Sequence, residues 1–156
     1  MRPITAHRVV AAPREAIFFV LADLAAHWSL SNQWTEVREL GPDGGVIRLQ
    51  GPFGIRRTAQ VRVRRREAPW LVAGEARLGA GTRARVAWEL APDGGARTAV
   101  RLSAWVEAAA WHDRLLLEAG GRRWLAWRFA VTLGRLEAAV GAAAPQPSAV
   151  CPSRST

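Results

Sequence analysis

Two side chains of this sequence stand out for the chemistry they could perform, His27 and Arg57. His27 lies near the end of "APREAIFFVLADLAAHW", and an imidazole placed there could donate a proton to a ligand carbonyl. Arg57 falls on the apolar side of "IRRTAQVRVRRRE", where a guanidinium needs an acidic partner, backbone carbonyls or a ligand anion. The structural alternatives are a surface or capping histidine and an arginine that reaches water at the open end of its strand. We favour the structural alternative for both residues.

Other catalytic and metal-binding patterns are missing from the sequence. No histidine and cysteine spacing fits zinc, and "GAGTRA" leads into a strand, which excludes a P-loop or a dinucleotide-binding loop. His112 and Asp113 are neighbours, so we expect their side chains to diverge, with Asp113 stabilising a helix start. Because the chain has no tyrosine, proton transfer would depend on His27, Arg57 or a lone carboxylate such as Glu36. We expect no metal and no cofactor.

The formal net charge is +9, and all 22 basic residues are arginines. Alternate residues of one expected strand form an arginine-rich strip, from Arg56 to Arg66, that could track phosphates. No aromatic side chains interleave with this strip for base stacking, so the solvated face of an antiparallel strand explains it better. Arginine also fills positions that other proteins give to lysine, as a codon bias toward G and C would produce. We therefore expect no nucleic acid partner.

The elements that must position these side chains are a strand, short helices, a run of strands and a long helix. The segment "PITAHRVVAA" (3–12) has strand character, and the period then becomes helical across Ile17, Val20, Leu21 and Leu24. From residue 34 to residue 107, strand signals alternate with turns, including Pro-Asp-Gly-Gly turns within 41–45 and 91–95. About six hairpin-linked strands after the first predict an antiparallel meander.

The segment from Trp111 to Val140 predicts a long amphipathic helix that contains two adjacent glycines, Gly120 and Gly121. Its apolar stripe and the edge of that stripe comprise Leu115, Leu125, Phe129, Leu133, Leu136 and Val140. We expect a continuous or slightly kinked helix in which Gly121 lines the sheet-facing side, and a break into two helices is the alternative. Trp124 flanks the stripe, whereas Trp127 lies opposite and should be partly exposed.

A length of 156 residues suits a single domain. We assign residues 1–141 to that domain and expect residues 142–156, proline-rich and without periodicity, to form a disordered tail. The start of the sequence lacks a secretory signal, and no apolar run is long enough to span a bilayer. The single cysteine, Cys151, excludes an internal disulfide, which fits a reducing, cytoplasmic location.

Three segments carry a resemblance to a known superfamily: "HRVVAAPREAIFFVLADLAAHW" (7–28), "ARVAWELAPDGGARTAVRLSAWVE" (84–107) and "RRWLAWRFAVTLGRLEAAV" (122–140). In these segments and in element order, residues 3 to 140 resemble the START-like (SRPBCC) superfamily, and its polyketide cyclase/dehydrase-like branch most. The resemblance implies an α+β helix-grip fold, with a curved antiparallel sheet of about seven strands (β-α-α-β6-α) and the long C-terminal helix across its concave face. It also implies a deep cavity beneath that helix.

Alternation along the strands assigns the faces of the sheet. Val86, Trp88 and Leu90 share the inward face, as do Val100, Leu102, Ala104 and Val106. Arg85, Glu89, Arg101 and Ser103 face outward. The cavity walls we expect are Trp28, Trp88, Leu102, Gly121, Trp124, Leu125 and Phe129, with Arg57 or His27 as a polar anchor.

The sequence leaves three functions open. The leading one is binding of a hydrophobic or aromatic small molecule, lipid or polyketide-like, in the cavity that the resemblance implies. The first alternative is an enzyme of the polyketide cyclase, aromatase or dehydrase type that uses the same cavity, with His27 and Arg57 as catalytic candidates. The second alternative is a basic module that docks on RNA or on an acidic partner. We favour binding over catalysis, because the sequence offers so few groups that could move a proton.

Overall fold

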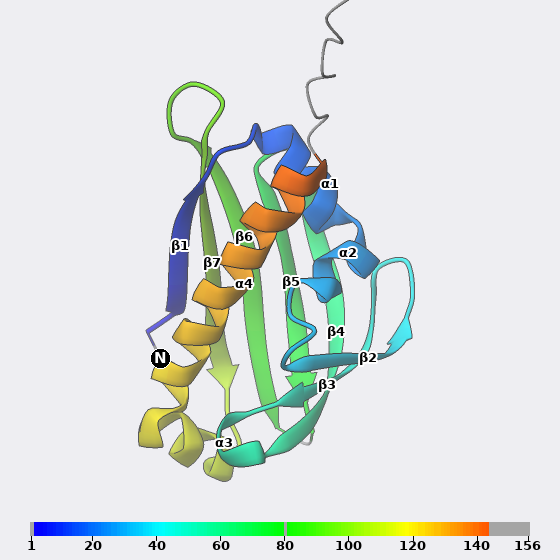
Figure 1. The fold of residues 1–156 in the computed structure, drawn as a ribbon. Coiled ribbons are helices and arrows are strands. Elements are labelled where there is room, and N and C mark those ends of the chain that lie inside the picture. The colour runs from blue at the N-terminus through cyan, green and yellow to red at the C-terminus, as the bar shows by residue number, and fades with distance from the viewer. Residues whose placement is uncertain (1, 80, 144–156) are drawn as a thin grey trace, which may run out of the picture.

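A single antiparallel sheet of seven strands forms the body of the protein in the computed structural model, which describes residues 2–79 and 81–143. The strand order is β1-β7-β6-β5-β4-β3-β2, so every pair except β1–β7 joins consecutive strands, as the sequence predicts for a meander (Figure 1). The strands are β1 (Ile4–Val10), β2 (Thr35–Leu40), β3 (Gly44–Gln50), β4 (Arg56–Glu67), β5 (Leu71–Leu78), β6 (Thr82–Pro92) and β7 (Thr98–Ala108).

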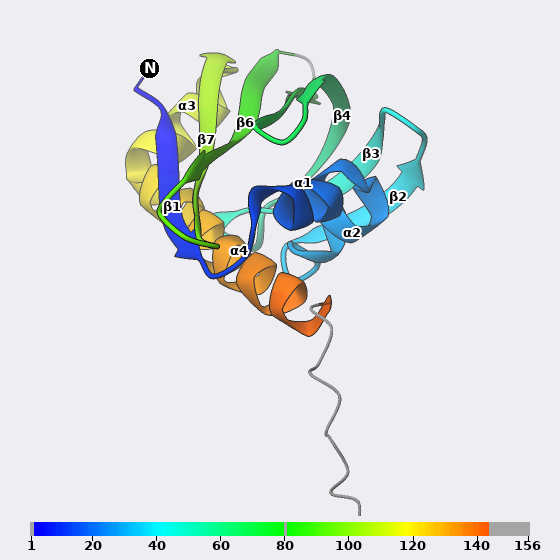
Figure 2. The same cartoon turned by 90° about the horizontal axis from the view of Figure 1, so that it is seen from above.

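The helices lie on one side of this sheet. The long helix α4 (Arg122–Ala143) crosses the concave face, and the sheet curls around it (Figure 2). The short helices α1 (Arg14–Ala22) and α2 (Leu24–Ser29) follow β1, α3 (Trp111–Leu116) follows β7, and a 3-10 turn, η1 (Pro52–Gly54), joins β3 to β4. This arrangement confirms the predicted helix-grip α+β fold. None of the helices within the described residues is long and apolar enough to cross a membrane.

The sequence sets the boundaries of the short helices. Pro13 immediately precedes α1, where a missing N–H costs no hydrogen bond. Asp23 separates α1 from α2: its backbone N–H donates to Phe19 O, and its side chain accepts hydrogen bonds from the N–H groups of Ala25 and Ala26. This cap orients α2 across the end of the sheet, and α2 carries His27 and Trp28.

The glycine pair breaks the C-terminal helix. The segment η2 (Leu117–Gly121) leaves helical geometry at Ala119, with ψ 17°, and at Gly120, with φ 112°, a value that favours glycine. The predicted continuous or slightly kinked helix is therefore wrong, and the two-helix alternative is confirmed. Because the break rotates α3 relative to α4, Leu115 leaves the predicted apolar stripe and is 60% exposed.

The apolar face of α4 divides into two halves. The second half carries Leu133, Leu136 and Val140, which are buried against α1, β1 and β7 in the main core. The first half, with Trp124, Leu125 and Phe129, faces the cavity described below. Trp127 lies on the other side of the helix and is 55% exposed, as predicted.

The faces predicted for β6 and β7 are confirmed, and exposure follows them for all but one side chain. Trp88 and Leu102 are each 3% exposed on the inner face, and Arg85, Glu89 and Arg101 are exposed on the outer face. Ser103 is the exception, because it is buried although it points outward. Its hydroxyl lies 3.2 Å from that of Thr5 on the neighbouring strand β1, which covers it.

The predicted domain end falls inside α4, which runs to Ala143 and thus includes the first two residues of the expected tail, 142–156. The remainder of that tail, with Cys151, lies outside the described residues.

Candidate functional site

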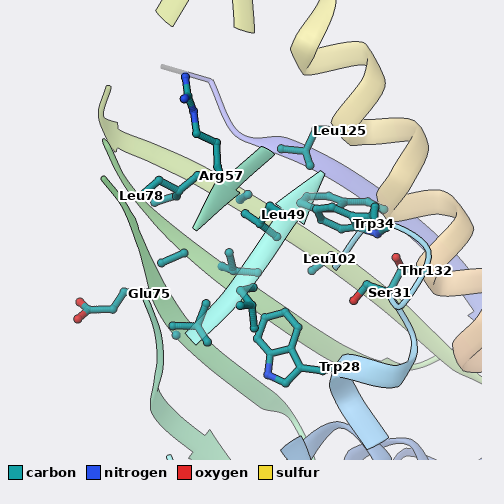
Figure 3. Close-up of a pocket in the computed structure, with 18 of the residues that line it drawn as sticks. Trp28, Ser31, Trp34, Leu49, Arg57, Glu75, Leu78, Leu102, Leu125 and Thr132 are labelled. Atoms are coloured by element: carbon teal, nitrogen blue, oxygen red, sulfur yellow. The ribbon is translucent and has the colours of Figure 1, made fainter. Parts of the chain in front are cut away.

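A cavity of about 280 Å³ lies between the concave face of the sheet and the first half of α4 (Figure 3). Its floor consists of inward-facing residues of β3 to β7, and α2, α3 and α4 supply the other walls. Most of its lining is aliphatic or aromatic, as in typical binding sites for organic molecules. Arg57 and Trp28 lie at opposite ends of the labelled lining residues in Figure 3, with Leu49 and Leu102 between them.

The structure brings most of the expected site residues together. The residues that line the cavity include His27, Trp28, Arg57, Trp88, Leu102, Trp124, Leu125 and Phe129. Gly121 does not line it, contrary to the sequence-based expectation. A Cβ atom at Gly121 would lie 2.6 Å from Leu116 O, so this glycine is required by the close approach of two turns of backbone at the helix break.

One end of the cavity holds a cluster of three rings. The His27 ring lies 5.1 Å from that of Trp28 and 5.4 Å from that of Trp88, and it meets Trp88 edge-on at 80°. Trp88 comes from β6, whereas the other two come from α2. The predicted surface position of His27 is therefore wrong, whereas the capping role is confirmed, because Nδ1 bonds Leu21 O at the C-terminal end of α1.

The protonation state of His27 follows from its surroundings. Burial lowers the pKa of His27 below its ordinary value, although the backbone hydrogen bond with Leu21 works in the opposite direction. The neutral ring is thus the form present at pH 7. Nδ1 lies 3.1 Å from Leu21 O, and Nε2 has no hydrogen-bond partner within residues 2–79 and 81–143.

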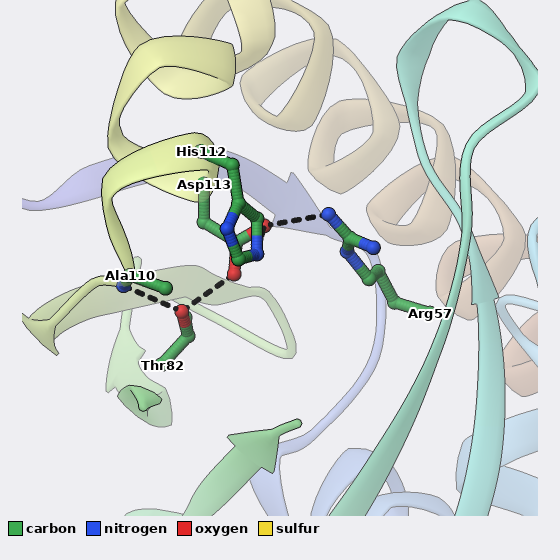
Figure 4. A network of polar contacts seen from close by, with 5 residues as sticks. All are labelled: Arg57, Thr82, Ala110, His112 and Asp113. Atoms are coloured by element: carbon green, nitrogen blue, oxygen red, sulfur yellow. Dashed lines mark hydrogen bonds and ion pairs between the residues drawn. The ribbon is translucent and has the colours of Figure 1, made fainter. Parts of the chain in front are cut away.

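A polar network lies at the other end of the cavity (Figure 4). Arg57 Nη2 donates to Asp113 Oδ1 at 3.2 Å, and Thr82 Oγ1 donates to Asp113 Oδ2 at 2.5 Å. Thr82 Oγ1 in turn accepts from the N–H of Ala110, just before α3. Asp113 therefore fixes α3 to β4 and β6. Arg57 reaches water as expected, since its side chain is 38% exposed, and it has an acidic partner as well. Asp113 lies in the first turn of α3 as expected, and it also ties that helix to the sheet.

His112 also departs from expectation. Its Nε2 lies 3.6 Å from Asp113 Oδ1, so the two neighbouring side chains converge. This is an ion-pair distance only when the imidazole is protonated, and it is too long for a hydrogen bond. Because Asp113 is already held by Arg57 and Thr82, His112 is an outer neighbour of the network.

The fold of this chain also occurs in proteins of known structure. No protein-family model matches the chain, and no curated protein does. Solved structures do: a protein from Thermus thermophilus has a TM-score of 0.69 at 19% identity, over 92% of this chain and 100% of that one. An aromatase/cyclase, Zhui, from a Streptomyces species has a TM-score of 0.65 at 21% identity, over 90% and 93%. A START superfamily protein from Mycobacterium smegmatis has a TM-score of 0.62 at 14% identity, over 91% and 99%.

The chain has the helix-grip fold of these solved structures. Several residues that line the cavity were not predicted from the sequence, notably Trp34, Ile47 and Leu49. Trp34 meets Trp124 of α4 edge-on, with ring centres 5.9 Å apart, and so joins the start of β2 to the helix. Ile47 and Leu49 are two residues apart on β3, and the alternation used for β6 and β7 would have placed them on one face.

Several polar groups of the cavity wall have no hydrogen-bond partner within the described residues. The indole N–H groups of Trp28, Trp34 and Trp88 and the Nε–H of Arg57 are buried and have no acceptor within the described residues. Each unpaired buried donor costs about 1–3 kcal/mol relative to a hydrogen-bonded one. The wall therefore has hydrogen-bonding capacity that this chain alone does not use.

Most of the arginine-rich strip of β4 lies on the outer face of the sheet. The side chains from Arg56 to Val63 alternate between the outer and the inner face, and Arg64 is 2.5 Å from Glu75. The register shift between Val63 and Arg65 then places Arg66 opposite Val72 of the inner face, so the expected strip ends before Arg66, which is 2.6 Å from Asp43. Up to that shift, the strip is the solvated strand face expected from the sequence. Within the part of the chain that the structure describes, no group of three or more His, Cys, Asp or Glu side chains is placed to hold a metal.

Proposed function

We propose that this protein binds a hydrophobic or aromatic small molecule, lipid or polyketide-like, in the cavity beneath α4. The observation that carries the proposal is the cavity itself: about 280 Å³ of space, walled by apolar side chains, inside a domain whose remaining core is closely packed. An apolar ligand that enters this space leaves water at a gain of about 25 cal/mol per Å² of buried surface.

The tryptophans give the cavity its preference for flat ligands. Trp28, Trp34, Trp88 and Trp124 all line it, and aromatic pairs add about 0.5–1.5 kcal/mol beyond the area they bury. Leu102, Leu125 and Phe129 complete the apolar wall that we assign to the ligand site. Arg57 is already paired with Asp113, so a ligand anion would have to compete for it.

Tryptophan fluorescence provides the test, since four of the eight tryptophans line the cavity. We expect anthraquinone to quench this fluorescence saturably and to raise the melting temperature. Ala84→Phe places a ring inside the cavity and should abolish both effects, whereas Ala138→Phe, on the exposed side of α4, should leave them unchanged. Saturable binding that survives in a folded Ala84→Phe variant would place the ligand elsewhere.

Catalysis of the aromatase/cyclase type is the second candidate, and one observation favours it. His27 is a neutral imidazole on the wall of the cavity, and such a ring can accept a proton from a ligand. Zhui, which shares the fold, is named an aromatase/cyclase. The test is the incubation of a poly-β-keto thioester with the protein: cyclised product that disappears in His27→Asn supports catalysis, and unchanged substrate contradicts it.

A further inference from the structure

We propose that the end of the cavity formed by His27, Trp28 and Trp88 recognises a phenolic or enolic hydroxyl group of the ligand, whose O–H donates a hydrogen bond to Nε2 of His27. The inference rests on the proposed function and narrows its ligand class from apolar molecules to hydroxylated aromatic or enolic ones.

The tautomer of His27 is fixed by the backbone. Nδ1 lies 3.1 Å from Leu21 O, and a carbonyl oxygen can only accept a hydrogen bond. Nδ1 must therefore carry the hydrogen. A neutral imidazole has a single N–H, so Nε2 is left with a lone pair and acts as an acceptor.

The position of the His27 ring is also fixed by its neighbours. Leu21 is fully buried at the end of α1, so the carbonyl that holds Nδ1 belongs to the core of the domain. The rings of Trp28 and Trp88 lie 5.1 Å and 5.4 Å from the His27 ring. An acceptor held in this way needs no reordering when a ligand arrives, so little of the hydrogen bond's free energy is lost.

Nε2 is the polar atom of this ring that is free to meet a ligand. It has no hydrogen-bond partner in the described part of the chain, while the ring lines the cavity. A bound ligand that seals the cavity without a donor leaves this acceptor unpaired, and one with a hydroxyl satisfies it. Burial favours the neutral ring over the charged one, which keeps the lone pair available.

The same geometry excludes the role that the sequence suggested for His27. A ligand carbonyl would place one acceptor against another, so His27 does not donate a proton to it in this tautomer. A hydroxyl group next to an aromatic ring fits better, because its apolar body can contact Trp28 and Trp88 while its O–H reaches Nε2.

The test compares two probes with the same ring system, 2-naphthol and 2-methoxynaphthalene, by calorimetric titration. We expect the wild-type protein to bind 2-naphthol about 5–10-fold more tightly, as one hydrogen bond of about 1 kcal/mol or slightly more implies. His27→Asn keeps an N–H for Leu21 O and lacks the Nε2 acceptor, so the ratio of the two Kd values should fall toward one. His7→Asn, on the exposed side of β1, is the matched control and should retain the preference.

The outcomes separate this inference from the function on which it rests. Equal binding of both probes by the wild-type protein would overturn the hydroxyl preference and leave the ligand site intact, and so would a preference that survives in His27→Asn. Failure of both probes to bind would remove both proposals. Nitrogen-15 spectra of the three histidines give a second readout on the wild-type protein: the inference requires a neutral His27 with its proton on Nδ1, and a proton on Nε2 would refute it.

Discussion

The break at Gly120–Gly121 allows one substitution, glycine to alanine, to be compared at two positions of the same C-terminal segment. At Gly134, in the middle of α4, an added Cβ meets no atom within 4 Å. At Gly121 it would lie 2.6 Å from Leu116 O, about 0.8 Å closer than the 3.4 Å at which ordinary contacts begin. The two substitutions should therefore change stability in opposite directions.

The expected magnitudes follow from these distances. Gly134→Ala gains the helix propensity of alanine and should raise the free energy of unfolding by about 0.5–1 kcal/mol. Gly121→Ala makes the same gain in propensity, but the clash is with backbone and can be relieved only by moving α3 away from α4. We expect the overpacking penalty, about 1–3 kcal/mol, to exceed that gain and to leave the variant less stable than the wild type.

Urea unfolding followed by circular dichroism measures both changes, and the comparison needs only their signs. An m-value equal to that of the wild type would show that the native state remains compact. If Gly121→Ala is stabilised as much as Gly134→Ala, the close approach at the break does not constrain residue 121, and our explanation of the glycine pair is wrong.

Three further outcomes are expected. As the pH falls from 6.5 to 5.5, the free energy of unfolding should fall by at most about 1.4 kcal/mol per pH unit. The unfolded chain binds a proton at the ordinary His pKa of 6.5, whereas the folded chain, with the lowered pKa of His27, does not. His27→Asn should remove this slope in urea titrations. Asp113→Asn should cost about 1 kcal/mol in thermal unfolding, since Arg57 is over a third exposed and water screens the pair; no loss would mean that the network does not hold α3. RNA binding should show no steep dependence on salt in filter assays, because Arg64 and Arg66 already have acidic neighbours, and a log–log slope of several units would revive the RNA alternative.

The fold could be predicted from the sequence because the patterns that define its strands are local. Hairpin turns and period-two alternation define each strand, and consecutive strands pair in all but one case, so the order of strands follows from the order of residues. The pairing of β1 with β7 is the long-range step, and the sequence did not predict it, because no local pattern reports which strand the first one meets. Trp88 and Leu102 were assigned correctly to the inner face for the same local reason.

The parts of the site that the sequence did not predict depend on contacts between distant segments. The partnership of Asp113 with Arg57 and Thr82 joins α3, β4 and β6, and no periodicity reports it. The position of His27 depends on how the cap at Asp23 turns α2, which a helical wheel does not contain. The helix break was not the favoured prediction because the apolar stripe continues across Gly120 and Gly121, whereas the break lies in the backbone angles of Ala119 and Gly120, which a helical wheel does not report.

The way in which α3 is attached has a consequence for local stability. This helix has no buried side chain, and its specific ties to the sheet are the ion pair with Arg57 and the hydrogen bonds through Thr82. Segments with little apolar burial open at a lower free energy than the global unfolding of the domain, whereas the second half of α4 lies in the core. Amide hydrogens of α3 should thus exchange well before those of α4, and the end of the cavity nearest Arg57 can open without unpacking the core.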